Sequence, residues 1–175
     1  EDNIAPTVST QNITVQLDAN GTASITVEDI NNGSSDNCEI ESMSIDVTSF
    51  DCTAVGDNTV TLTVTDVNGN SAKATAVVTV EDNIAPIASY SAPFTIQLDE
   101  TGSATITVDD INNGSSDNCD VASRTLSKYT FTTADIGIVP LTLTVTDSSG
   151  LTDACVVDVT VEAATGPDPP EAICD

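Results

Sequence analysis

The chain has 175 residues, of which 28 are acidic and only 3 are basic, and it contains no His and no Trp. The formal net charge of −25 excludes nucleic acids and anionic membrane surfaces as partners, because both carry negative charge. No apolar run approaches the ~18 residues of a membrane-spanning helix, so we expect no membrane insertion of this segment. The sequence starts and ends inside a repeated pattern without a signal peptide, which indicates a segment of a longer protein.

The sequence is an internal tandem repeat. Arrays of this kind build extended objects from contacts between neighbouring repeats. We predict three parts: repeat 1 over residues 1–80, repeat 2 over residues 81–162, and a linker with the start of a third repeat over residues 163–175. The motifs that recur are "EDNIAP" at Glu1–Pro6 and Glu81–Pro86, "QLD" at Gln16–Asp18 and Gln97–Asp99, "DINNGSSDNC" at Asp29–Cys38 and Asp110–Cys119, and "TLTVTD" at Thr61–Asp66 and Thr142–Asp147.

Within each repeat, apolar residues alternate with polar ones at a period of two, which is typical of half-buried strands. Val, Ile and Thr dominate, and their β-branched side chains suit a pleated surface. Turn residues separate the runs, and no segment shows a helical period. We predict two tandem immunoglobulin-like antiparallel β-sandwich domains, arranged end to end. The strands expected in repeat 1 cover Ile13–Leu17, Ala23–Val27, Ile40–Val47, Thr59–Thr65 and Ala72–Val80.

This topology predicts that three polar segments of each repeat meet at one pole. They are the incoming N-terminal segment, the loop after the second strand and the loop before the last strand. Each is dense in carboxylate and amide oxygens. The candidate metal ligands are Asp2, Asn3, Asp29, Asp36, Asp66 and Asn68 in the first repeat, and Glu81, Asp82, Asn83, Asp110, Asp117 and Asp147 in the second.

Carboxylates gathered at one pole would repel one another without a counterion, and these segments contain no Lys or Arg. Calcium suits the composition because it takes 6–8 hard oxygen ligands, whereas magnesium demands octahedral geometry and keeps its waters. The alternative is that Asn, Asp and Gly are ordinary turn formers. Convergence of three loops in both repeats favours calcium. The ion could lie within a domain, at the junction formed by Glu81–Asn83, or at both.

Five cysteines are present, at positions 38, 52, 119, 155 and 174. None has a CxxC spacing and there is no His, so a zinc site is disfavoured. Disulfides in an exported protein are the better interpretation. The odd number leaves at least one thiol without a partner in this sequence.

The pattern "EDNIAP … DINNGSSDNC … VGDNTVTLTVTDVNGN … VVTV" resembles the HYR (hyalin-repeat) domain. It is similar to the tandem HYR-like repeats of large Bacteroidota cell-surface adhesins of the SprB gliding type. The resemblance covers both repeats and is strongest over Gly56–Asn70. It implies an immunoglobulin-like fold, export to the cell surface by type IX secretion, and adhesion. "EDNIAP" also resembles the calcium-binding linker "DxNDNAP" of cadherins, which implies Asp82 and Asn83 as ligands.

The resemblance also carries an expectation for the cysteines. Related repeats place cysteines in "DNC" and "FDC", which implies a bridge between Cys38 and Cys52, and closing such a loop is worth ~3 kcal/mol. Cys119 with Cys155 is a second candidate pair, although the usual early-strand partner of Cys155 is missing. Cys174 would find its partner beyond this sequence.

The function predicted is a calcium-stiffened stalk or spacer of a filamentous extracellular adhesin, used for gliding or attachment. Its partners would be neighbouring repeats of the same chain and an unidentified surface target. The chain has no His and no recognisable nucleophile setting, so we expect no enzyme. The alternative is a calcium-dependent glycan- or protein-binding module. An aromatic-lined pocket would favour that alternative, but the chain has only 2 Tyr and 3 Phe.

Overall fold

The computed structural model describes residues 2–91 and 93–166, and the chain divides into two compact units, Glu1–Ile84 and Ala85–Asp175. The boundary lies a few residues beyond the predicted end of repeat 1. The predicted start of a third repeat falls on residues outside the described part of the chain. No helix among the described residues is long and apolar enough to cross a bilayer.

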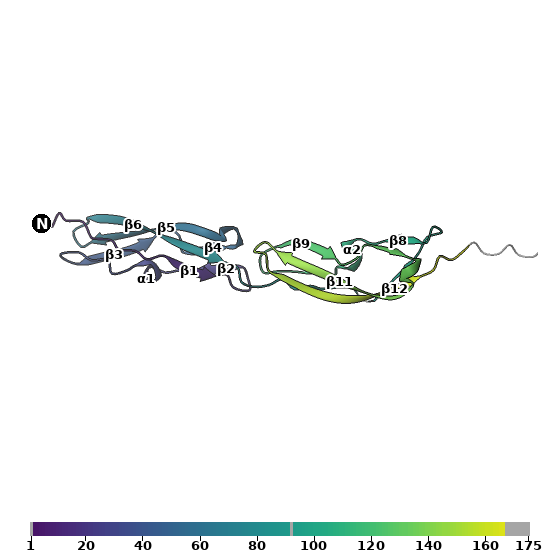
Figure 1. Ribbon diagram of the computed structural model, residues 1–175. Coiled ribbons are helices and arrows are strands. Elements are labelled where there is room, and N and C mark those ends of the chain that lie inside the picture. The colour runs from purple at the N-terminus through teal and green to yellow at the C-terminus, as the bar shows by residue number, and fades with distance from the viewer. Residues whose placement is uncertain (1, 92, 167–175) are drawn as a thin grey trace, which may run out of the picture. The chain divides into compact units, whose positions relative to one another are not determined.

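The first unit is built from short strands and one long hairpin (Figure 1). Strands β5 and β6 have 11 residues each and pair antiparallel along their length. One sheet has the strand order β1-β6-β5-β3 and the other pairs β2 with β4. Strand β1 runs parallel to β6, while the other pairs are antiparallel. The elements are β1 (Ile13–Gln16), β2 (Thr22–Ser24), α1 (Val27–Ile30), β3 (Ile40–Ile45), β4 (Ser49–Asp51), the 3-10 turn η1 (Cys52–Ala54), β5 (Gly56–Asp66) and β6 (Ser71–Glu81).

The second unit repeats this arrangement. Its sheets have the orders β7-β12-β11-β9 and β8-β10, and β7 lies parallel to β12. Together the two units confirm the predicted pair of immunoglobulin-like β-sandwiches. The elements are β7 (Phe94–Gln97), β8 (Ser103–Thr105), α2 (Val108–Ile111), β9 (Val121–Leu126), β10 (Thr130–Thr132), η2 (Thr133–Asp135), β11 (Gly137–Asp147) and β12 (Thr152–Glu162).

The period of two explains which side chains form each core. In β5, Val60, Leu62 and Val64 are fully buried, whereas the threonines between them are only partly buried. Successive strand residues point to opposite faces, so this alternation fills one face with aliphatic side chains. In the second unit the core consists of Ile96, Leu98, Ile106, Ile111, Leu126, Phe131, Leu141, Leu143, Val145, Val157, Val159 and Val161.

The structure corrects one prediction of secondary structure. Val27 was expected to end a strand, but it begins the helical turn α1, and α2 follows at the same place in the second unit. A single turn is too short to show a helical period in the sequence. Each turn ends in a buried isoleucine, Ile30 or Ile111, which closes the core between the two sheets.

The assignment of strand faces predicts a large difference between two substitutions on β11. Leu143 is 0% exposed, so Leu143→Ala should destabilise the second unit by about 2–5 kcal/mol through lost burial and a cavity. Ile138 is 70% exposed on the same strand, and Ile138→Ala should change stability by less than about 0.5 kcal/mol. Urea unfolding followed by circular dichroism measures both, and equal costs would contradict the assignment.

Candidate functional site

The crossover segment, residues 29–38 of the first unit and 110–119 of the second, runs antiparallel to the chain that enters each unit. In the first unit, isolated bridges join Thr7 to Ser35 and Thr10 to Asn31. Ser34 Oγ accepts the Ser9 N–H at 3.0 Å and also lies 3.3 Å from the Ser9 carbonyl oxygen. The two ends of the segment are therefore held at different levels of the sandwich.

Asp29 and Asp110 stabilise the helical turns. Asp29 Oδ2 accepts hydrogen bonds from Thr26 N at 2.7 Å and Thr26 Oγ1 at 2.9 Å, and Asp110 does the same with Thr107 at 2.7 and 2.8 Å. These hydrogen bonds lower the pKa of Asp29 and of Asp110. Each carboxylate thus completes a capping box with the Thr three residues before it. The signal was present in "TVED" and "TVDD", where a Thr precedes an acid by three residues.

At the other end of the crossover segment the structure brings three predicted or neighbouring residues together. We call Asp2, Asp36 and Cys38 the acidic cluster. One ligand atom of each lies within 4.8 Å of those of the other two. Asn37 Nδ2 donates to Asp2 Oδ2 at 3.0 Å, and Asp36 Oδ2 accepts the Cys38 N–H at 2.9 Å. Asp29 lies outside this cluster, at the level of Gln11, whose Nε2 donates to the Asp29 carbonyl oxygen.

Asp66 ends β5 beside the acidic cluster and is fully buried. Its Oδ1 accepts the N–H groups of Asn68 and Asn70 at 2.8 Å each, and its Oδ2 accepts Asn70 Nδ2 at 2.8 Å. Burial acts to raise the pKa of Asp66, but the hydrogen bonds from Asn70 and Asn68 hold it below its ordinary value. Asn70 Nδ2 also lies 3.1 Å from the Asp2 carbonyl oxygen. The hairpin turn therefore satisfies its own buried acid and anchors the incoming chain.

The donor set of the acidic cluster suits a hard cation. Asp36 Oδ1 is buried and has no hydrogen-bond partner among the described residues. A hydrogen bond to Asp2, burial, and the charges of Asp2, Asp36 and Asp66 raise the pKa of the Cys38 thiol. The thiol therefore stays protonated at neutral pH, which disfavours the soft metals that bind thiolate. The carboxylate oxygens of Asp2 and Asp36 are ligands that calcium prefers.

The second unit keeps the crossover segment but changes its surroundings. Ser115 Oγ binds Ser89 as Ser34 binds Ser9, and Asp117 Oδ2 accepts the Cys119 N–H at 2.9 Å. Asp117 Oδ1 is a buried acceptor without a hydrogen-bond partner in the described part of the chain. Asp82, the repeat equivalent of Asp2, belongs to the first unit.

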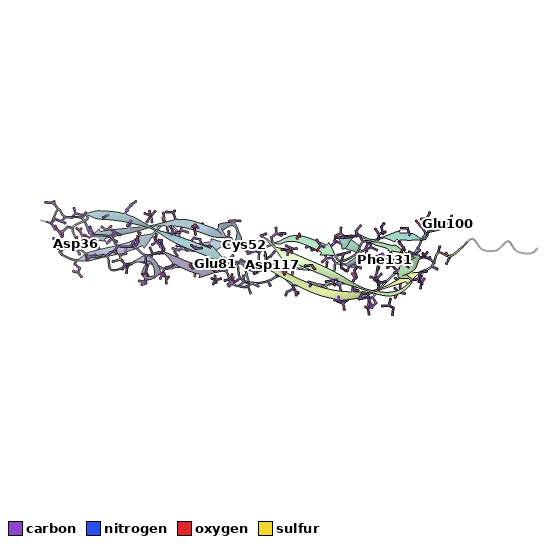
Figure 2. The ribbon with its side chains drawn as sticks, viewed as in Figure 1. Asp36, Cys52, Glu81, Glu100, Asp117 and Phe131 are labelled. Atoms are coloured by element: carbon purple, nitrogen blue, oxygen red, sulfur yellow. The ribbon has the colours of Figure 1, made fainter. Side chains whose placement is uncertain are left out.

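Other predicted ligands lie elsewhere. Asn3 and the Asn68 side chain are exposed. Glu81 Oε2 accepts Gln16 Nε2 at 2.7 Å, and Asn83 Nδ2 donates to Gln16 Oε1. Figure 2 shows that Glu81 and Asp36 lie at opposite ends of the first unit. Glu81 and Asn83 therefore contribute nothing to the acidic cluster.

The structure also corrects the two disulfide pairings. Cys38 and Cys155 are free thiols, whereas Cys52 and Cys119 are disulfide-bonded, so neither Cys38–Cys52 nor Cys119–Cys155 is formed. Cys38 lies near the last residue of β5 and Cys52 just before the first, as the positions of Asp36 and Cys52 in Figure 2 show. Eleven strand residues span about 35 Å, whereas bridged Cα atoms lie within about 7 Å.

Cys155 is separated from Cys119 in the same way. It lies in β12 opposite Leu143, and its thiol packs against the core. Cys119 precedes β9, whose Val121 pairs with Asp147. The four residue steps from Leu143 to Asp147 span about 13 Å of strand. The motif resemblance could not detect this separation.

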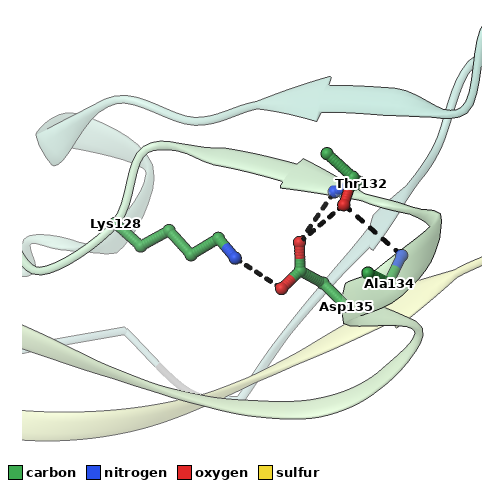
Figure 3. Close-up of polar contacts among 4 residues, drawn as sticks. All are labelled: Lys128, Thr132, Ala134 and Asp135. Atoms are coloured by element: carbon green, nitrogen blue, oxygen red, sulfur yellow. Dashed lines mark hydrogen bonds and ion pairs between the residues drawn. The ribbon is translucent and has the colours of Figure 1, made fainter.

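Basic groups neutralise very little of the acidic charge. Within the described residues the one ion pair joins Lys128 Nζ to Asp135 Oδ1 (Figure 3). Asp135 Oδ2 also accepts the Thr132 N–H at 2.8 Å, and Lys128 Nζ lies 5.4 Å from the centroid of the Phe131 ring. The hydrogen bond from Lys128 is the largest cause that lowers the pKa of Asp135. This contact joins the segment before β10 to the last residue of η2.

The first unit also has a groove of about 450 Å³, lined by Thr22, Val47, Ser49, Phe50, Asp51, Thr53, Ala54, Asn58 and Thr59. Phe50 is the one aromatic residue in this lining, and it is 5% exposed. Its ring thus belongs to the core and offers little surface for stacking against a ligand.

No family model matches the chain, and no curated protein matches it. Among solved structures, Drosophila N-cadherin EC1-4 is similar at 13% identity with a TM-score of 0.50, covering 93% of this chain and 50% of that one. Human protocadherin-24 EC1-2 is similar at 13% identity with a TM-score of 0.44, covering 94% and 100%. The fibronectin(III)-like modules of Clostridium thermocellum CbhA are similar at 12% identity with a TM-score of 0.37, covering 93% of this chain and 97% of that one. The chain spans half of the N-cadherin structure, and the likeness is one of fold.

Hydrogen bonding of the carboxylates predicts loss of stability in acid. Folded pKa values below the unfolded value mean that this stabilisation is complete above about pH 4 and is lost as the pH falls through the folded pKa values. The melting temperature should therefore drop as the pH falls from about 4 to about 2 at constant ionic strength. A continuous rise down to about pH 2 would show that relief of charge repulsion dominates instead. The acids with lowered pKa are Asp18, Asp29, Asp46, Asp51, Asp66, Asp99, Asp110 and Asp135.

The corrected cysteine pairing predicts a labelling pattern. Iodoacetamide applied to the native chain without reductant should alkylate exposed Cys38 and leave Cys52 unlabelled. Peptide mass spectrometry reads the result. The raised pKa of Cys38 should make labelling faster as the pH increases. A disulfide-linked peptide joining Cys38 to Cys52 would contradict the structure.

Proposed function

We propose that the chain is a calcium-stabilised structural repeat of an extracellular adhesin, acting as a spacer and not as an enzyme. Tandem β-sandwich units and the cadherin-like fold of the structural neighbours support the adhesion-type repeat. The resemblance to HYR-like repeats supports export to a bacterial cell surface by type IX secretion and a use in gliding or attachment. Neighbouring repeats of the same chain and a surface target would be the partners.

The observation that carries the calcium part of the proposal is the acidic cluster. Two carboxylates lie within 4.8 Å of each other, and Asp36 Oδ1 is buried without a hydrogen-bond partner among the described residues. Such an arrangement is costly unless a positive charge compensates it. Asp2 and Asp36 would hold the ion. Bound calcium would supply that positive charge and join the incoming chain to the crossover segment.

The placement of the terminal strands supports a load-bearing role. Strand β1 lies next to β6 in parallel, with four register pairs from Ile13–Val78 to Gln16–Glu81. Tension that pulls the start of β1 and the end of β6 apart loads these pairs in shear, so that their hydrogen bonds must break together. Strands β7 and β12 have the same arrangement, from Phe94–Val159 to Gln97–Glu162. A spacer needs this resistance in every repeat.

The binding-module alternative receives less support. Its expected feature is an exposed aromatic pocket, whereas the aromatic ring that lines the groove of the first unit, Phe50, is buried. The spacer remains the function that the described geometry favours.

Calcium should raise the melting temperature of the 175-residue chain relative to EGTA. At a free concentration about 100 times the dissociation constant, linkage gives ~2.7 kcal/mol per site, or about 10 °C or more for a domain of this size. Differential scanning calorimetry measures the change, with magnesium as a comparison. A transition that is the same in EGTA and in calcium would remove calcium from the proposal.

Matched variants locate the effect. The double variant Asp2→Asn with Asp36→Asn should lose the calcium-induced shift of the first unit. Glu28→Gln removes an exposed acidic charge on α1, outside the acidic cluster, and should retain the shift. Equal responses of the two variants would indicate general screening of the net charge instead of a site.

A further inference from the structure

The two units close the same acidic hairpin turn in different ways. The first unit reads "DVNGN" and the second "DSSGL", so Leu151 occupies the position of Asn70. In both turns the aspartate Oδ1 accepts two backbone N–H groups; for Asp147 these are Ser149 and Leu151, at 2.8 Å each. Only the first turn has a side-chain donor for Oδ2, because Leu151 carries no polar group.

One carboxylate oxygen of Asp147, Oδ2, is consequently left without a donor among the described residues. The residue is 2% exposed, and its Oδ2 is buried without a hydrogen-bond partner among the described residues. A buried carboxylate oxygen without a donor is strongly unfavourable, since burial removes its hydration and no hydrogen bond compensates for that cost. The equivalent oxygen of Asp66 receives Asn70 Nδ2 at 2.8 Å. The second unit therefore needs a positive partner at a position where the first unit supplies its own.

A second acid in the same unit has the same deficit. Asp117 Oδ1 is buried and also lacks a hydrogen-bond partner in the described part of the chain. Asp147 pairs in register with Val121, the first residue of β9. Asp117 lies four residues before Val121 in the chain. The first unit has the same geometry: Asp66 pairs in register with Ile40, and the Val67 N–H donates to the Glu39 carbonyl oxygen at 3.1 Å, three residues after Asp36. The hairpin turn and the end of the crossover segment therefore share one pole.

Basic side chains do not meet this need. The only ion pair that the described residues form is that of Lys128 with Asp135. Arg124, on β9, directs Nη2 toward the Ser115 carbonyl oxygen at 3.5 Å. Asp117 and Asp147 are therefore acids without a base, in a chain that has only 3 basic residues.

We propose that Asp147 Oδ2 and Asp117 Oδ1 are ligands of a divalent cation of the calcium class, and that Leu151 makes the second unit depend on this ion more than the first. Asn70 acts as the built-in substitute in the first unit, where its amide occupies the side of Asp66 that the ion would take. This inference rests on the proposed function and adds a difference between its two repeats.

Hydrogen exchange of the full chain, followed by mass spectrometry, tests the difference because it reports on each hairpin separately. Calcium chloride is compared with EGTA. Calcium should slow exchange of the β11–β12 hairpin about 10- to 100-fold, the effect expected from satisfying one buried charged acceptor, and should slow the β5–β6 hairpin less.

Substitutions at the two turn positions are matched. Leu151→Asn should slow exchange of β11–β12 in EGTA and reduce its response to calcium, because the amide can now donate to Asp147. Leu151→Ala shortens the same side chain without adding a donor and should leave the calcium response unchanged. Asn70→Leu should make the β5–β6 hairpin exchange faster in EGTA and respond more strongly to calcium. Asp147→Asn should abolish the response of β11–β12.

The outcomes separate this inference from the proposed function. Calcium protection of β5–β6 that equals or exceeds that of β11–β12 overturns the inference and leaves the calcium-stabilised spacer in place. A slower exchange in Leu151→Asn without any calcium effect on β11–β12 also overturns it, since Asp147 would then lack a donor in the native chain but would not bind the ion. Calcium protection of neither hairpin overturns both.

Discussion

The structure depends on how a chain with 28 acidic and 3 basic residues satisfies its carboxylates. Ion pairs cannot do so, and backbone N–H groups at turns take their place. Asp18 accepts the N–H groups of Asn20 and Thr22, Asp99 those of Thr101 and Ser103, and Asp51 that of Thr53. Each such acid lies where a strand ends, so the same turn that reverses the chain also stabilises the carboxylate by hydrogen bonds.

The crossover segment shows the same principle at its highest density, which gives a physical reason why "DINNGSSDNC" is identical in both units. Asp29 caps the helical turn, Ile30 fills the core, and Asn31 Oδ1 accepts the Ser34 N–H. Gly33 has a φ of 78°, a conformation that other residues rarely adopt. Ser34 binds the incoming chain, as Ser115 does in the second unit. Most of the motif therefore stabilises the β-sandwich itself, and only its last residues, Asp36 and Cys38, belong to the acidic cluster.

Backbone donors are too few for the carboxylates around the acidic cluster and its equivalent in the second unit. The proposed calcium dependence follows from this local shortage of hydrogen-bond donors. Two features decide how severe it is: the separation of the carboxylates and the residue that closes the hairpin turn. Asn70 supplies a donor to the buried Asp66, whereas Leu151 leaves Asp147 without one. In a spacer, an ion at this position would hold the incoming chain against the unit whose terminal strands bear the load. The same carboxylate oxygens would then contribute both to the stability of the unit and to its resistance to tension.

The sequence by itself determined the tandem repeat, the strands and the alternating core, because period-two patterning and turn residues are local properties. It also contained the capping boxes, which the strand pattern obscured. Only the tertiary structure decided which distant residues meet. Asp29 and Asp36 are seven positions apart in one motif, yet the bridges to the incoming chain hold them at different levels. The 11-residue strand β5 keeps Cys38 away from Cys52, and a buried oxygen on Asp147 becomes visible once the turn is built. Spacing along the chain does not encode these distances, since they are set by strand length and register.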